Sequence, residues 1–268
     1  KPDKCLDNVI AYMAVHTVSS PELNAVQFPL FMRLLYVDGL EALGEWNFAL
    51  AERLDLLASS NRPGKKELYE ASQCAIKADQ PQKALELCLP ILDENAEDDI
   101  ALGLCGEAYT QSRDFITSID YFRKAVRLAP SRAELWLQLA QACKLAGMDA
   151  QRLDVLKAAS QALPDDAEIQ LVLGEAYLSR NAPTQALIYL RRAASLETKP
   201  RIMLRLGQTL LQLGHLEEAR TILENAYFAE KENQSSLDNA QDPDLLGLEL
   251  MHAYGRSLLS TGDRENAI

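Results

Sequence analysis

The chain repeats itself at a nearly fixed interval. Four copies of one short motif, of the type Gly-Glu-Ala-Tyr, begin at Gly106, Ala140, Gly174 and Gly207, and neighbouring copies lie 34, 34 and 33 residues apart. An interval of this length is typical of helix-turn-helix units that stack on one another, and not of a single globular core. The interval therefore predicts an all-α protein in which each unit contributes two helices.

Other residues recur at the same phase of the interval. Ala186 and Ala193 follow Gly174 by 12 and 19 residues, and the next unit repeats this arrangement. Pro130 and Pro164 occupy equivalent places near the ends of two units. Small residues allow two helix backbones to approach closely, and a proline just past a helix prevents its continuation.

Together these residues resemble the tetratricopeptide repeat family. The unit from Glu134 to Pro164 carries the family's pattern residues, namely Trp136, Leu139, Ala140, Gly147, Leu156, Ala159 and Pro164. The preceding unit carries Leu102, Gly106, Tyr109, Phe115, Phe122, Ala125 and Pro130. The resemblance implies a right-handed α-solenoid superhelix of about six to seven helix-turn-helix units.

The quality of the match divides the chain into segments. An N-terminal helix and connection are expected in residues 1–25, with apolar residues at helical spacing between Asp3 and His16. Degenerate units follow in 26–98, well-matched units in 99–230, a polar insertion in 231–244 and the start of a further, truncated unit in 245–268. In the first degenerate unit, Phe28 to Leu40 is the expected first helix, and the second begins after Gly44. The chain is expected to be a piece of a longer protein.

The polar insertion is visible in the spacing, because Gly255 follows Gly207 by 48 residues. Its composition is polar and poor in aromatic residues, which predicts a loop without order of its own. The alternative is a loop that binds a partner or is phosphorylated, with Ser235 and Ser236 as candidates.

Composition excludes several classes of function. The net charge of −12 argues against nucleic acid as the main partner, because binding to phosphates relies on clustered Lys and Arg. No run of residues has the length and apolar character of a membrane span. The five cysteines form no C-x-x-C pair and are expected to be reduced and to pack in the core, which favours a cytoplasmic or nuclear location.

The sequence contains no arrangement of residues that predicts catalysis. The three histidines are far apart, and no metal-binding motif or activated-serine motif is present. Asp98-Asp99 and Asp165-Asp166 precede first helices, where aspartate is expected to cap the free amide groups. Asn61 to Lys66 lacks key residues of a phosphate-binding loop and is expected to connect two repeats. We therefore expect no enzyme, no cofactor and no metal site.

The resemblance implies where a partner would bind. In the family, the first helices line a concave groove, and the side chains at positions 2, 5, 9 and 12 of a unit point into it. The candidate partner-binding residues taken from these first helices are Leu137, Gln141, Lys144, Leu171, Glu175, Leu178, Arg201, Leu204, Arg205 and Gln208. Leu137, Leu171 and Leu204 would form an apolar ladder, with the arginines setting the orientation of the partner. In the alternative, these leucines are covered by the chain's own packing.

The expected function is a non-enzymatic scaffold that binds a partner helix or extended peptide with apolar anchors, as part of a multiprotein assembly. A carboxylate clamp for heat-shock chaperones is not expected, because Leu137, Gln141 and Val172 stand where that clamp needs Lys and Asn. One alternative is a regulatory or substrate-recruiting domain of a larger enzyme. A second alternative is a bacterial envelope or secretion assembly factor.

Overall fold

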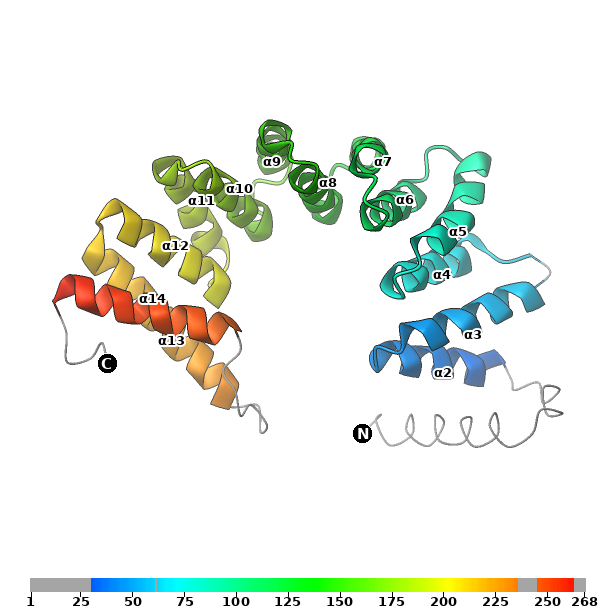
Figure 1. Ribbon diagram of the computed structural model, residues 1–268, viewed down its shortest axis with the longest axis horizontal. Helices are drawn as coiled ribbons and strands as arrows, with labels where there is room; N and C mark the ends of the chain where they lie inside the picture. Colours follow the sequence, from blue (N-terminus) through cyan, green and yellow to red (C-terminus); the bar gives the residue numbers. More distant parts are fainter. Residues whose placement is uncertain (1–29, 61, 236–244, 263–268) are drawn as a thin grey trace. The chain divides into compact units, whose positions relative to one another are not determined.

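The described part of the protein is all-α. The computed structural model describes residues 30–60, 62–235 and 245–262, and these residues form thirteen helices and no strand (Figure 1). They divide into two compact units, with the boundary between Ala129 and Pro130. Each unit is a stack of helix pairs, which confirms the helical-repeat fold expected from the interval.

The first unit contains three helix pairs. They are α2 (Leu30–Ala42) with α3 (Trp46–Ser59), α4 (Lys65–Lys77) with α5 (Pro81–Glu94), and α6 (Asp99–Gln111) with α7 (Phe115–Leu128). The second unit contains α8 (Ala133–Leu145) with α9 (Asp149–Ala162), α10 (Ala167–Ser179) with α11 (Pro183–Leu196), α12 (Pro200–Leu213) with α13 (Leu216–Ser235), and α14 (Leu245–Thr261).

The two helices of a pair meet at the first residue of the repeated motif. Gly106 lies against the ring of Phe122, and a Cβ atom at this glycine would come within 2.8 Å of that ring. Leu156 occupies the equivalent place beside Ala140, and both side chains are buried in one cluster. A small residue on the first helix thus receives a large apolar residue from the second, and this contact forms the centre of each pair.

Short polar contacts fix the helix starts. The Asp98 carboxylate accepts a hydrogen bond from the Ala101 amide at 3.0 Å, and Asp166 accepts one from Ile169 at 2.9 Å. These bonds confirm that the two aspartates cap helices, because the first amide groups of a helix have no partner within it. Pro164 ends the preceding segment, and its carbonyl accepts a hydrogen bond from the Gln170 side chain.

The turns inside the pairs contain a residue in the left-handed backbone conformation. Gly147 and Gly214 adopt it with φ values of 71° and 81°, and Asp79, Arg113 and Asn181 adopt it with φ values between 55° and 62°. These five residues follow the interval of the repeat. The geometry of the turn is therefore kept even where the chain does not supply glycine.

The division of the chain into degenerate and well-matched repeat units stays a prediction. Helices α2 and α3 lie where the two helices of the first degenerate unit were expected. The expected loop over 231–244 is wrong in its first part, because α13 continues to Ser235. Residues 231–235 contain Lys, Glu and Gln, which favour helix, and no glycine or proline to end it. Three predictions concern residues outside the described ranges. They are the helix between Asp3 and His16, the candidate Ser236, and the truncated unit after residue 262.

Candidate functional site

The candidate partner-binding residues all lie in the second unit, on its first helices. Their positions match the register predicted by the repeat, because α8, α10 and α12 begin at Ala133, Ala167 and Pro200. Their exposure, however, differs strongly from one position to the next. Gln141, Lys144 and Arg201 are exposed, and the half-buried members are Leu137, Glu175, Leu178, Arg205 and Gln208.

Two leucines of the expected ladder belong to the core. Leu171 is 0 % exposed and Leu204 is 1 % exposed. Leu171 packs in a cluster with Leu190 and Ile202, and Leu204 packs with Leu223 of α13 and other residues of α13 and α14. The expectation that they form an accessible ladder is wrong, because successive helices pack so closely that these side chains fill the space between them.

Between α10 and α12, the accessible part of this surface is instead a row of charged and polar side chains. Arg201 contacts Glu168 at 2.9 Å and Glu175 at 3.5 Å. Arg205 contacts the same Glu175 at 3.1 Å and donates a hydrogen bond to the Gln208 side chain. We call these five side chains the α10–α12 polar ladder. Since it joins neighbouring repeats and is partly exposed, it can exchange its internal contacts for contacts with a partner.

The end of this surface lies between α12 and α14. A hollow of about 320 Å³ is lined there by Gln208, Leu211, Gln212, His252, Ala253 and Arg256. The expected site residues did not include His252 and Arg256. The spacing would have revealed them, because the shift of 48 residues that relates Gly207 to Gly255 also relates Leu204 to His252 and Gln208 to Arg256.

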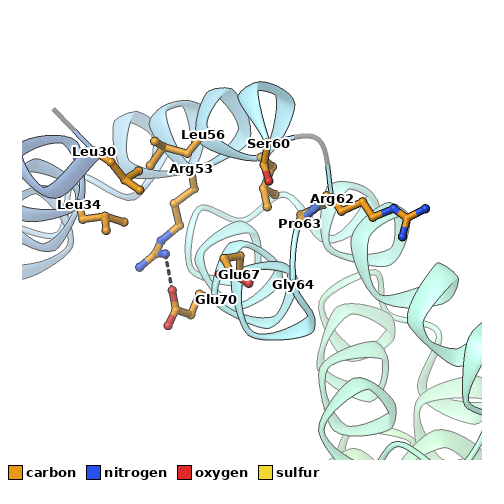
Figure 2. A pocket seen from close by; sticks show the side chains of 11 residues that line it. Leu30, Leu34, Arg53, Leu56, Ser60, Arg62, Pro63, Gly64, Glu67 and Glu70 are labelled. Carbon is orange, nitrogen blue, oxygen red and sulfur yellow. Dashed lines mark hydrogen bonds and ion pairs between the residues drawn. The ribbon is translucent and has the colours of Figure 1, made fainter. Parts of the chain in front are cut away.

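The first unit has a separate hollow of about 190 Å³ between α2, α3 and α4 (Figure 2). Its apolar wall includes Leu30, Leu34 and Leu56, and Figure 2 shows Arg62 pointing away from it. Arg53, on its floor, contacts Glu70 at 2.8 Å and Glu41 at 2.7 Å. The charge of Arg53 is therefore already neutralised by the chain itself. As expected, the segment from Arg62 to Gly64 connects two pairs at the surface.

The thiol groups of the described residues are buried inside the repeats. Cys74, Cys88, Cys105 and Cys143 form no disulfide bond with one another and are buried, which confirms their expected packing role. Burial raises the pKa of the Cys74 thiol to about 11, so this thiol is protonated at neutral pH. Cys5 lies outside the described residues. Among the described residues, no three His, Cys, Asp or Glu side chains are grouped as metal ligands.

The similarity of the chain to known proteins agrees with this architecture. Two family profiles, both described as tetratricopeptide repeat, match residues 101–132, 153–201 and 200–227. Over these residues the chain consists of tetratricopeptide repeats. As a class, such repeats are protein-interaction modules and are not themselves catalytic. Among curated proteins, none matches the chain at a significant level.

Several solved structures share the fold. The "MamA RS-1 ArsTM double mutant" is 20% identical with a TM-score of 0.55, over 64% of this chain and 97% of that chain. YrrB, described as "a TPR protein with an unusual peptide-binding site", is 19% identical with a TM-score of 0.51, over 68% and 87%. The "APC/C hetero-tetramer Cut9-Hcn1" is 15% identical with a TM-score of 0.52, over 98% of this chain and 48% of that chain. Identities this low establish the fold alone.

In the part of the chain that the structure describes, no helix has both the length and the apolar character needed to cross a bilayer.

Proposed function

We propose that this protein is a non-catalytic scaffold that binds a segment of a partner protein along the first helices of its second unit. The partner, a helix or an extended peptide, contacts the α10–α12 polar ladder and the exposed end of α8. The observation that carries the proposal is the ladder itself, in which Arg201 and Arg205 share Glu175 between two repeats. A partner with complementary charges replaces these internal pairs, and recognition is therefore specific to the charge pattern.

The apolar contribution comes from fewer residues than a full leucine ladder would supply. Leu137 and Leu178 are half-buried and keep accessible surface, whereas Leu171 and Leu204 act by holding the helices together. Gln141 and Lys144 add exposed polar contacts on α8. We therefore expect moderate affinity that depends on salt, because exposed charged contacts are screened by ions.

Two solved structures support an interaction role. A peptide-binding site is named for YrrB, and a multiprotein assembly is named for Cut9, and both share the fold. Asp98 and Asp166 cap α6 and α10, which gives these two aspartates a structural role. The buried free thiols fit a reducing compartment, the cytoplasm or the nucleus.

The test is a charge swap that reverses the Glu175–Arg205 ion pair, keeps opposite charges at these two positions and changes the pattern presented to a partner. We expect Glu175→Arg/Arg205→Glu to lose most captured protein in a pull-down from cell extract while its thermal midpoint stays close to that of the unchanged protein. The matched control is Arg191→Glu/Glu218→Arg, because Arg191 and Glu218 form a 2.7 Å pair between the second helices α11 and α13. Capture that survives the first swap, or is lost equally with the control, contradicts the proposal.

A further inference from the structure

The hollow between α12 and α14 differs from the rest of the first-helix surface in its charge. Arg201 and Arg205 are neutralised by glutamates, but Arg256 forms no ion pair with any described residue. Arg256 and His252 are exposed, so their polar atoms are accessible in this hollow. A guanidinium group carries a permanent positive charge and five N–H donors in a planar fork. This part of the surface therefore offers a positive charge that no described carboxylate satisfies.

The amide of Gln208 beside it can act as a hydrogen-bond donor. The Gln208 Oε1 atom accepts a hydrogen bond from Arg205 Nη1 at 3.1 Å. Gln208 also lines the hollow, and its NH₂ group, which supplies two N–H donors, has no hydrogen-bond partner among the described residues. Arg256 and Gln208, from neighbouring first helices, therefore both present N–H groups. Two sets of donors around one space favour an anionic group.

An apolar patch adjoins the charged space. A second hollow is lined by Leu211, Leu216, Leu259, Arg256 and Ser260, and it shares Leu211 and Arg256 with the first. Leu259 is 56 % exposed, so an apolar side chain placed here would cover surface that is now in contact with water. The first hollow therefore suits a carboxylate and the second a large apolar side chain, and one peptide segment can supply both groups if they are close neighbours in it.

We propose that the α12–α14 hollow binds an acidic side chain of a partner protein, with an adjacent apolar side chain of the same segment resting on Leu211 and Leu259. Arg256 is the charge partner of the carboxylate, and the Gln208 amide is its second donor. This inference rests on the proposed function and deepens it, because it names the chemistry of the bound segment. A single arginine beside apolar surface, in a chain of net charge −12, favours a carboxylate in a peptide over a nucleic acid.

The test uses the whole chain and a defined probe, a fluorescein-labelled synthetic peptide of three Asp-Leu repeats. Two control peptides replace either every Asp with Asn or every Leu with Ser. We expect fluorescence anisotropy to show binding of the Asp-Leu peptide and at least tenfold weaker binding of both controls. Arg256→Gln should weaken the binding of the Asp-Leu peptide at least tenfold. Arg256→Lys should bind the peptide more tightly than Arg256→Gln and less tightly than the unchanged protein, because lysine keeps the positive charge but lacks the planar guanidinium group.

Each result decides the inference. Arg256 is exposed and has no ion-pair partner among the described residues, so Arg256→Gln is expected to keep the thermal midpoint. Arg191→Gln, at an exposed arginine of α11 outside the hollow, serves as the control. An Asp-Leu peptide that does not bind, that binds Arg256→Gln equally well, or that binds no better than the Asn-Leu peptide overturns the carboxylate site. The proposed function is judged separately, since it depends on whether the Glu175→Arg/Arg205→Glu swap abolishes protein capture.

Discussion

A Cβ atom on Gly174 would lie 2.7 Å from the Cγ atom of Leu190, which places the backbone of α10 directly against a side chain of α11. Leu190 follows Gly174 by 16 residues, and the same spacing joins Gly207 to Leu223, where the corresponding distance is 2.5 Å. Real Cβ atoms do not approach other atoms so closely. The glycines are therefore required by the distance between the two helices of a pair.

Gly174→Ala is expected to destabilise the protein by about 1–3 kcal/mol, because the added methyl group must push Leu190 out of a filled core. This loss outweighs the higher helix propensity of alanine. Urea unfolding followed by circular dichroism measures it. Gln185→Ala, at an exposed position of α11, is the control and should change stability by less than about 0.5 kcal/mol. A Gly174→Ala protein as stable as the control would mean that the two helices move apart without cost.

The sequence predicted most of this architecture because the repeat supplies the same evidence several times. Small residues at one phase, such as Gly106 and Gly174, indicate helices in close contact from the sequence alone. The end of α13 was not predicted, since residues 231–235 are polar and polar composition alone does not separate a loop from the exposed end of a helix.

The turn residue Arg113 offers a second test. It has a φ of 62°, a left-handed conformation that costs a side-chain-bearing residue about 1 kcal/mol relative to glycine. Arg113→Gly should therefore raise the free energy of unfolding by up to about 1 kcal/mol. Ser112→Gly, one residue earlier with a φ of −69°, should lower it because glycine there only adds freedom to the unfolded chain. Equal effects of the two glycines on urea unfolding would contradict this explanation.

Leu171 and Leu137 occupy the same position of successive repeats and should respond differently to glutamate. Leu171→Glu places a charge at a site that is 0 % exposed, and we expect a loss of roughly 3 kcal/mol or more and a partial loss of helicity. Leu137 is half-buried, so Leu137→Glu should keep the far-ultraviolet circular dichroism of the unchanged protein. A fully helical and equally stable Leu171→Glu protein would show that Leu171 is accessible after all.

Asp98 makes stability depend on pH. Burial raises the pKa of its carboxyl group, but hydrogen bonds from Tyr69 at 2.6 Å, the Ala101 amide and Lys65 outweigh that effect and hold the pKa below its ordinary value. A group with a lowered pKa in the folded state contributes stability above the unfolded pKa of about 3.9 and loses that contribution as the pH falls through the folded pKa.

Asp98→Asn should therefore cost about 1 kcal/mol at pH 7, where the charged bonds are present, and much less near pH 2. Asparagine keeps the ability to cap α6, so the difference reports the charge and not the cap. Urea unfolding at both pH values measures it. A cost that stays constant between them would assign the effect to geometry alone.

The candidate site was less predictable than the fold. The repeat register placed Arg201, Arg205 and Glu175 on the same face, but sequence alone does not distinguish a residue facing a partner from one facing the next helix, as Leu171 and Leu204 demonstrate. Conversely, Arg256 was overlooked because the inserted residues before α14 interrupt the regular count. Exposure depends on how neighbouring repeats pack, and this packing is a property of the assembled stack.

The central claim is that partners bind the first-helix surface of the second unit. Its most direct test is photocrosslinking in cell extract from p-benzoylphenylalanine placed at Gln141 on α8, or at Lys157 on α9, which is also exposed. We predict one protein that crosslinks strongly from Gln141 and not from Lys157, with a yield that falls at least tenfold in the Glu175→Arg/Arg205→Glu background. Equal crosslinking from both positions, or a Gln141 yield unaffected by the swap, would contradict the account.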